Sequence, residues 1–329
     1  MNAHREIKSH RIEIRTQIAV KWDFAGPDNF VSEPKNHDKH AKERHKLRTD
    51  GWFVATFGGH GRNYIASDPS YKPMRKDLIA DLFKKEETYW WNVAKREMVF
   101  RLLNSLGFLN EGRDNAIAAD IGCGAGFTAK AFDSHYRMVG VDVSIDALQF
   151  CQGRGLKRLC QINTERFSLP FKSESFHLVL ALDVIEHLED DVYALRECRR
   201  ILKSDGKLIV TVPAFMALWS PWDEALGHRR RYTARDLAET AKKAGFQIDR
   251  LSYMFFFSFP LAVLIRYLKR TLQKDPSRYS SDFIPIPKLA NQLLILVGRI
   301  EQWILTRLQW NLPIGLSVIS VMTKRGDVG

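Results

Sequence analysis

The chain has 329 residues, of which 45% are apolar, and 50 Lys and Arg residues against 38 Asp and Glu residues give it a formal net charge of +12. A chain of this length and apolar content holds one large globular domain with additions around a substantial core. The positive charge indicates an anionic partner, such as a phosphate group, a nucleic acid or a membrane surface.

The cysteines and the hydropathy of the chain exclude several classes of protein. The four cysteines form no CxxC pair, which argues against a disulfide framework or a cysteine zinc site and favours reduced thiols. The first residues lack the apolar segment of a signal peptide, and no run of about 20 uncharged apolar residues is present. We therefore expect a cytoplasmic protein without a leader or a membrane-spanning helix.

Residues 1–70 are expected to form a polar N-terminal extension that is partly disordered. Apolar residues alternate with polar ones from Ile12 to Trp22, which predicts one exposed strand. Residues 23–50 are polar, and we expect a loop or a disordered segment there. The irregular spacing of the histidines in this segment indicates solvated side chains and not a metal site.

Residues 71–110 are expected to form a helical cap. This segment is predicted to hold two helices that are interrupted near Phe83, and the second helix carries an apolar stripe at helical spacing. Either the stripe packs against the main domain, or the helix covers a ligand site with Trp90, Trp91 and Arg96 facing the ligand.

The stretch AIAADIGCGAG, residues 116–126, has the pattern of a buried strand that ends in a glycine-rich turn. Asp120 stands near the end of the strand, and three glycines follow within five residues: Gly122, Gly124 and Gly126. Glycines let the backbone turn sharply and let a ligand approach the peptide N–H groups. Because residues 127–132 are predicted to form a helix that begins at the same place, the pattern favours a nucleotide-type site over a turn without a ligand.

The next predicted strand, residues 136–143, ends near Asp142. An acidic residue about 20 positions after the first glycine of such a loop can accept hydrogen bonds from both hydroxyls of a ribose. The alternative is that Asp142 only caps the helix that follows it. The loop spacing disfavours a nicotinamide dinucleotide, whose loop reads G-x-G-x-x-G, because here Gly126 follows Gly124 by two residues.

Four segments of the chain resemble the class I S-adenosylmethionine (SAM)-dependent methyltransferases. They are, in order, DIGCGAGF, VGVDVS, LPFKSESFHLVLALDVIEHL and RILKSDGKLIVTVP. The resemblance extends from about Glu86 to Lys324, and the ExxxWW and DEALGHRRRYT segments resemble a bacterial subgroup often associated with lipid-linked glycan or cell-envelope pathways. It implies an α/β fold with a doubly wound, Rossmann-like sheet of seven strands. Their implied order is 3-2-1-4-5-7-6, with the last strand antiparallel.

The resemblance implies that SAM is the cofactor and assigns residues to it. The expected cofactor-binding residues are Asp120, Gly122, Gly124, Gly126, Asp142, Val143, Asn163, Thr164 and Asp183. The adenine-binding residue should follow a third strand at residues 158–163, where this chain departs from the family pattern by extra residues. Asn163 and Glu165 are both candidates, and we favour Asn163 because it lies nearer the strand end.

An apolar run at residues 176–183 predicts a central parallel strand. Ligands of open α/β sheets gather at the carboxyl ends of strands, so Asp183 and its neighbours should face the methyl group. His187 could orient or deprotonate an acceptor hydroxyl there, or Glu186 and His187 could simply begin the next helix. One acidic–imidazole pair without a second group of ligands is insufficient evidence for a metal site, and we assign no metal.

The segment AFMALWSPWDEALGHRRRYTARDL follows a strand that ends at Pro213. Its aromatic, acidic, imidazole and guanidinium groups suit a polar acceptor, since arginine binds phosphate or carboxylate through paired hydrogen bonds. We expect His228 to be the catalytic base, with His187 as the alternative. The expected acceptor-binding residues are Trp219, Trp222, Arg230, Arg231 and Tyr232. The opposing interpretation is a solvated, charged turn before a helix at residues 234–245.

Two further strands are predicted at residues 247–257 and 316–323, and an unusually apolar insertion separates them. YMFFFSFPLAVLI is followed directly by RYLKR, and residues 289–310 place apolar side chains on one helical face. Apolar helices flanked by Lys and Arg suit a membrane interface. A hydrophobic lid or a dimer face explains the same pattern equally well.

Together these patterns predict a chain in five parts. They are a polar extension at 1–70, a helical cap at 71–110, a SAM-binding core at 111–257, an apolar helical insertion or lid at 258–313, and the last strand and tail at 314–329. The predicted activity is methyl transfer to an oxygen or nitrogen of a small or lipid-linked acceptor, with the protein peripheral at the anionic inner face of a membrane.

Three rival classes share some of these features: an RNA methyltransferase, a NAD-dependent oxidoreductase and a noncatalytic SAM fold. No added RNA-binding module is visible in the sequence, so we expect no nucleic-acid partner. The oligomeric state stays open.

Overall fold

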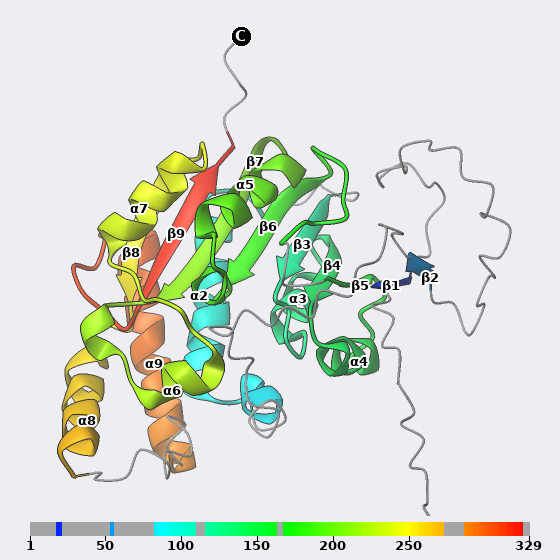
Figure 1. Cartoon of the computed structure of the whole chain (residues 1–329). Coiled ribbons are helices and arrows are strands. Elements are labelled where there is room, and N and C mark those ends of the chain that lie inside the picture. The colour runs from blue at the N-terminus through cyan, green and yellow to red at the C-terminus, as the bar shows by residue number, and fades with distance from the viewer. Residues whose placement is uncertain are drawn as a thin grey trace, which may run out of the picture.

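The computed structural model describes residues 18–21, 53–55, 82–109, 116–162, 167–272 and 286–324. Most of the expected extension at 1–70 lies outside these described residues, as do the adenine candidates Asn163 and Glu165 and the expected cofactor-binding residue Thr164. The described residues form one twisted sheet with helices around it (Figure 1).

Seven strands make the main part of the sheet. They are β3 (Ile117–Ile121), β4 (Arg137–Asp142), β5 (Leu159–Gln161), β6 (Phe176–Leu182), β7 (Leu202–Pro213), β8 (Gln247–Met254) and β9 (Ser317–Thr323). Their order across the sheet is β5-β4-β3-β6-β7-β9-β8, which confirms the predicted 3-2-1-4-5-7-6 arrangement. β3 is parallel to β4 and β6, whereas β9 is antiparallel to β7 and β8, as predicted.

Two short strands extend the sheet beyond β5. β1 (Ile18–Lys21) pairs antiparallel with β5, and β2 (Phe53–Ala55) pairs antiparallel with β1. β1 lies within the strand predicted from Ile12 to Trp22, and the rest of that segment is outside the described residues. β2 was not predicted, because three residues are too few to show an alternating pattern.

The middle of the sheet is buried on both faces. The last four residues of β3 and all seven residues of β9 are buried. Strands covered on both faces need apolar side chains at successive positions, which explains why these segments read as apolar runs. Because β3, β4, β6 and β7 run parallel, the loops that follow them meet at one edge of the sheet.

Short helices connect the strands. They are α3 (Phe127–Phe132), α4 (Ile145–Gly153), α5 (Asp191–Ile201), α6 (Pro221–Leu226) and α7 (Ala234–Lys243). Three begin with side-chain caps, on Ser144, Asp190 and Thr233, each of which accepts a backbone N–H of the first turn. The 3₁₀ turns η2 (Ile185–His187) and η3 (Met216–Leu218) follow β6 and β7. Glu186 and His187 therefore belong to a separate turn that precedes α5.

Helix α2 (Trp90–Ser105) packs against α9 (Lys288–Trp303), which comes from the far end of the chain. The two helices lie close together at Gly298, where an added Cβ would lie 2.9 Å from the Cβ of Ala94. Gln302 Nε2 donates a hydrogen bond to the carbonyl of Ala94 at 3.2 Å. Side chains and backbone thus join these two segments of distant sequence into one helical layer.

The apolar stripe of α2 is used for packing. Trp90 is buried, and the ring of Trp91 stacks on Phe255 with the centroids 4.2 Å apart. These contacts favour the packing interpretation over tryptophans that face a ligand. The predicted interruption near Phe83 was wrong: Phe83 lies inside a helix at 82–86 with its ring against Phe150, and the interruption falls at residues 87–89.

The apolar insertion forms α8 (Phe259–Leu272) and α9, and a π-helical turn η5 (Ile304–Leu308) follows α9. Figure 1 shows α8 and α9, in yellow-orange and orange, extending past the edge where the parallel strands end. Within the described ranges, no helix combines the length and the apolar character needed to cross a bilayer.

Candidate active site

The glycine loop between β3 and α3 has a backbone that requires glycine. Gly122, Gly124 and Gly126 have φ angles of 69°, 53° and 83°, in the left-handed region that other residues rarely adopt. A Cβ on Gly122 would also lie 2.6 Å from a methyl carbon of Val184, and one on Gly126 would lie 2.6 Å from the sulfur of Cys151. Both conformation and space therefore restrict these positions to glycine.

The N–H groups of this loop bind carboxylates from elsewhere in the chain. Ala125 N and Phe127 N donate to the two oxygens of Glu86, at 2.8 and 3.3 Å. Gly124 N donates to Asp142 Oδ2 at 2.9 Å. Sequence reasoning missed Glu86, although it is the first residue of the ExxxWW segment, which was the available signal.

Asp142 links the end of β4 to the glycine loop. Its Oδ1 accepts the N–H of Ser144 at 2.8 Å, while Ser144 itself caps α4. Asp142 thus orders the start of the helix without being its cap. Burial raises the pKa of Asp142, and three backbone hydrogen bonds oppose that effect. Its assignment to a ribose stays a prediction, and Val143 beside it is 44% exposed.

Asp120 is buried beneath the same loop. Within the described part of the chain, its Oδ2 has no hydrogen-bond partner. Burial, together with the charges of Glu86 and Asp142, raises the pKa of Asp120 to about 8. A cationic group bound here would favour the ionised carboxylate. This orphaned oxygen fits the ammonium group of a cofactor of the predicted type, and the N–H groups of the glycine loop fit its acceptor groups if they exchange their present carboxylate partners.

Asp183, at the end of β6, is paired with a cation that sequence reasoning also missed. Lys95 Nζ of α2 lies 2.5 Å from Asp183 Oδ2, and Thr211 donates to Oδ1 at 2.8 Å. Burial alone would raise the pKa of Asp183, but Lys95 and Thr211 hold it below its usual value. The cap helix therefore contributes a positive charge to the carboxyl edge of the sheet.

The loop after β7 is organised around Asp223. This buried carboxylate accepts hydrogen bonds from Ser220 N, His228 Nδ1 and Arg231 Nε, each at 2.8 Å. Burial would raise the pKa of Asp223, yet the bonds from His228 and Arg231 hold it well below its usual range. Arg231 also donates to the carbonyl of Ala214 at 3.1 Å. One aspartate thus ties both ends of the loop together.

The predicted acceptor-binding residues of this loop are mostly engaged within the protein. Trp222, Arg231 and Tyr232 are buried, and the Tyr232 hydroxyl donates to Asp191 at 2.7 Å. Arg230 donates to the carbonyls of Leu188 and Glu189. Trp219 is half-buried. The interpretation as a solvated turn does not describe such a loop, and the role of these residues in acceptor binding stays a prediction.

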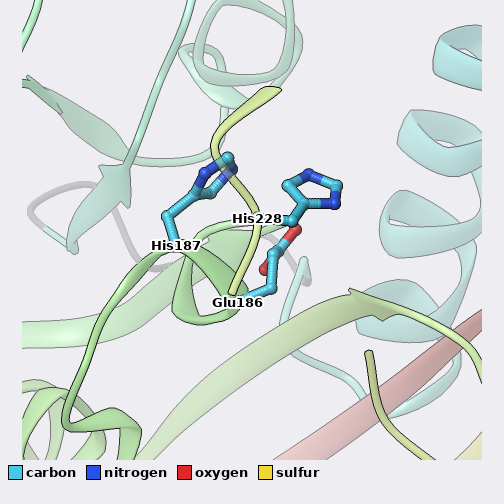
Figure 2. Close-up of side chains that lie close together, drawn as sticks. All are labelled: Glu186, His187 and His228. Atoms are coloured by element: carbon cyan, nitrogen blue, oxygen red, sulfur yellow. The ribbon is translucent and has the colours of Figure 1, made fainter. Parts of the chain in front are cut away.

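The structure brings the two candidate bases together. The rings of His187 on η2 and His228 have centroids 4.8 Å apart, and the carboxylate of Glu186 lies beside them (Figure 2). Burial and the neighbouring His228 lower the pKa of His187 to about 4, so its imidazole is neutral at physiological pH. Burial and Asp183 raise the pKa of Glu186 well above its usual value. Imidazole nitrogens and a carboxylate oxygen at this separation could hold a metal ion.

Comparison with known proteins identifies the central part of the chain. Residues 119–210 match the family model described as a methyltransferase domain. A probable SAM-dependent methyltransferase of Mycolicibacterium smegmatis is 29% identical over 167 residues, which cover 50% of this chain and 62% of that protein. The human probable tRNA methyltransferase 9B is 28% identical over 131 residues, 36% of this chain and 28% of that protein.

A solved structure of phosphoethanolamine N-methyltransferase 2 from Haemonchus contortus, in complex with SAM, aligns with a TM-score of 0.45 and 19% identity over 75% of this chain and 60% of that one. The chain spans less than two thirds of the length of either curated relative. The family match and the named relatives confirm the predicted SAM-dependent methyltransferase domain and its cofactor. They specify no acceptor.

Proposed function

We propose that this chain, which carries a class I SAM-dependent methyltransferase domain at residues 119–210, methylates an oxygen or nitrogen of an amphipathic, lipid-linked acceptor at the cytoplasmic face of a membrane. The carrying observation is a set of exposed apolar side chains on and next to the helices of the insertion. We name it the α8–α9 surface, and it consists of Leu261, Leu264, Leu268, Leu289, Leu293, Leu296, Ile300, Trp303 and Trp310.

The α8–α9 surface has the pattern of amphipathic helices, with large apolar side chains exposed along each helix. Leu289, Leu293 and Leu296 follow one another at helical spacing, and Ile300 and Trp303 continue the row. Leu289 is 69% exposed and Trp310 is 68% exposed, which is unfavourable for such large side chains in water. A bilayer interface would accept this row at the boundary between headgroups and acyl chains.

Exposed cations border the same surface. Lys288 begins α9, and Arg307 stands in the turn that follows it. Near an anionic bilayer each such residue contributes about 1 kcal/mol of attraction. The net charge of +12 for the whole chain acts in the same direction.

Helix α8 contacts the loop of the candidate active site, and α9 is fixed to the segment that precedes α8. Arg266 of α8 donates a hydrogen bond to the carbonyl of Leu218, in the loop that carries His228. Glu301 of α9 accepts the N–H groups of Phe255 and Phe257 at 2.7 and 2.8 Å. An acceptor held in the membrane by its lipid could therefore present its polar end to the loop after β7.

The residues of the chain have separable tasks in this reaction. When bound, SAM would supply an electrophilic methyl group on its sulfonium for transfer to a lone pair of the acceptor, with S-adenosylhomocysteine as the leaving group. Asp120, the glycine loop and Asp142 hold the cofactor. Since His228 Nδ1 is directed to Asp223, its Nε2 is the nitrogen left to take the acceptor proton, with His187 as the alternative base. Alignment of this kind is worth on the order of 7–11 kcal/mol in favourable cases.

Vesicle flotation tests the membrane part of the proposal. We expect the protein to float with vesicles of phosphatidylcholine and phosphatidylglycerol, less with phosphatidylcholine alone, and less at high salt. The double substitution L293D/L296D should abolish flotation, whereas Y193D, at an exposed residue of α5, should preserve it. A wild-type protein that stays in solution under all conditions would instead support a lid or a dimer face.

Label transfer tests the acceptor class. Tritiated SAM is incubated with the protein and either a total lipid extract or total tRNA, since one relative is named as a probable tRNA methyltransferase. We expect label in the lipid fraction, at a rate that L293D/L296D lowers. Label in the tRNA alone would establish the RNA alternative and overturn the lipid-linked acceptor.

A further inference from the structure

We propose that Glu186, His187 and His228 bind a Zn²⁺ ion at the carboxyl edge of the sheet, beside the loop after β7. Each residue offers one ligand atom, and the three atoms all lie within 4.8 Å of one another. Figure 2 shows the three side chains gathered from two segments, η2 and the loop after α6. Sequence distance hides this cluster, because His228 stands 41 residues after His187.

The ligand set has the composition of a zinc site with an open position. Two imidazole nitrogens and one carboxylate oxygen are a set that catalytic zinc ions use, with a fourth position for water or substrate. Imidazole ligands favour Zn²⁺ over Mg²⁺, which prefers oxygen ligands. Zinc bonds of about 2.0–2.1 Å place tetrahedral ligand atoms about 3.4 Å apart, so a closure of the side chains by little more than an ångström completes the site.

Glu186 supplies an independent reason for a bound cation. Its side chain is 0% exposed, and neither carboxylate oxygen has a hydrogen-bond partner within the described residues. A buried carboxylate without a partner is costly, by several kcal/mol if it is ionised. The nearby cations Lys95 and Arg231 do not remove this cost, because Asp183 and Asp223 hold them at 2.5 and 2.8 Å.

Hydrogen bonds to neighbouring groups position two of the proposed ligands. Asp223 accepts the hydrogen bond of His228 Nδ1, which fixes the ring and leaves Nε2 for a metal, as carboxylate–histidine–metal arrangements require. Arg229 N donates to the carbonyl of Glu186 at 2.8 Å and so fastens the loop to η2. The ring of His228 and the backbone that carries Glu186 are thus positioned before any ion binds.

The open position of the metal site suits an oxygen of the acceptor. This role of the ion in methyl transfer rests on the proposed function. An ion there would lower the pKa of an acceptor hydroxyl, so its proton could leave to water as the oxygen attacks the methyl carbon. The two histidines would then act as ligands in place of a protein base. Zinc binding itself does not depend on which acceptor is used.

Zinc titration of the full-length protein tests the site. After dialysis against EDTA, we expect calorimetry to show one strong Zn²⁺ site per chain. E186Q, H187A and H228A should each weaken it by at least about 100-fold, and H135A, a histidine remote from the site, should leave it unchanged. Co²⁺ should give the visible absorption of a tetrahedral ion in the wild type and H135A, and not in the three ligand variants. Retained SAM binding shows that each variant is folded.

The outcomes separate this inference from the proposed function. A wild type that binds SAM but no Zn²⁺ overturns the metal site, and so does a zinc affinity in H187A and H228A that equals that of the wild type. Zinc binding that requires the three residues supports it even if lipid extracts receive no label. Full methylation of the lipid fraction in excess EDTA would overturn the role of the ion in the reaction.

Discussion

The glycine loop and the loop after β7 face the same edge of the sheet but use their polar groups in opposite ways. In the glycine loop, backbone N–H groups bind two carboxylates from elsewhere, Glu86 and Asp142. In the loop after β7, Asp223 binds His228 and Arg231 of the same loop. The first is a cradle whose bonds a ligand can replace, and the second is a unit folded around its own buried carboxylate.

The two loops should therefore respond differently to substitution. Groups that only hold the loop after β7 together should affect stability, whereas groups of the glycine loop should affect cofactor affinity. Three substitutions can break or sharpen this division.

The largest expected effect is on stability. Asp223→Ala should lower the free energy of unfolding by about 3–5 kcal/mol, because it leaves the buried guanidinium of Arg231 without its carboxylate. Denaturant unfolding measures this loss. Glu224→Ala, at the exposed neighbour in α6, should change stability by less than about 0.5 kcal/mol. Equal stability of the two variants would show that Asp223 does not organise the loop.

A smaller effect is expected on cofactor binding. Asp142→Ala should weaken SAM by about 100-fold, since two hydrogen bonds to a charged carboxylate are lost at about 1.5 kcal/mol or more each. Isothermal calorimetry on the folded variant measures the change, and Asp146→Ala, exposed in α4, is the matched control. Unchanged affinity in Asp142→Ala would restrict this residue to ordering the loop and the helix start.

The smallest effect is a pH dependence of SAM affinity. The pKa of Asp120 is about 8 without ligand, so its carboxyl is neutral at pH 6 and must lose a proton to pair with the ammonium group of SAM. Affinity should therefore rise from pH 6 to 7.5, by at most about tenfold per unit, before the amino group of SAM loses its own charge near 7.7–8.0. Glu86 and Asp142, whose pKa values are also raised, act with the same sign.

Calorimetry across this pH range tests the prediction. Asp120→Asn should flatten the rise. Because the pKa of Asp120 is raised in the folded protein, the free protein should also lose stability as pH rises from about 4 to 8, and the same substitution should reduce that loss. A wild-type affinity that is flat with pH would show that Asp120 exchanges no proton on binding.

The fold could be predicted from the sequence because its signals are local. Apolar runs mark the buried strands. The left-handed backbone of the loop between β3 and α3 requires glycine, and glycines are identified directly in the sequence. The strand order came from the resemblance, which the family match confirms. What the sequence predicted best was therefore backbone conformation.

The side-chain contacts of the site could not be predicted in the same way. Glu86 reaches the N–H groups of Ala125 and Phe127 from about 40 residues earlier, and nothing in the sequence shows where its helix docks. Arg231 was expected to bind an acceptor, yet Asp223, eight residues before it, encloses it in the protein. The sequence of a charged loop does not show whether its side chains bind a ligand or form ion pairs with one another.

The contact between α2 and α9 has a consequence for folding during synthesis on the ribosome. Trp90 N donates to Asn291 Oδ1, a bond between residues 201 positions apart. At about 5–20 residues per second, α2 leaves the ribosome about 10–40 seconds before α9 can cover it. During that interval Ala94 and its neighbours on α2 lack the helix that covers them in the folded protein. We therefore expect α2 to expose apolar side chains during synthesis, where a chaperone could bind them.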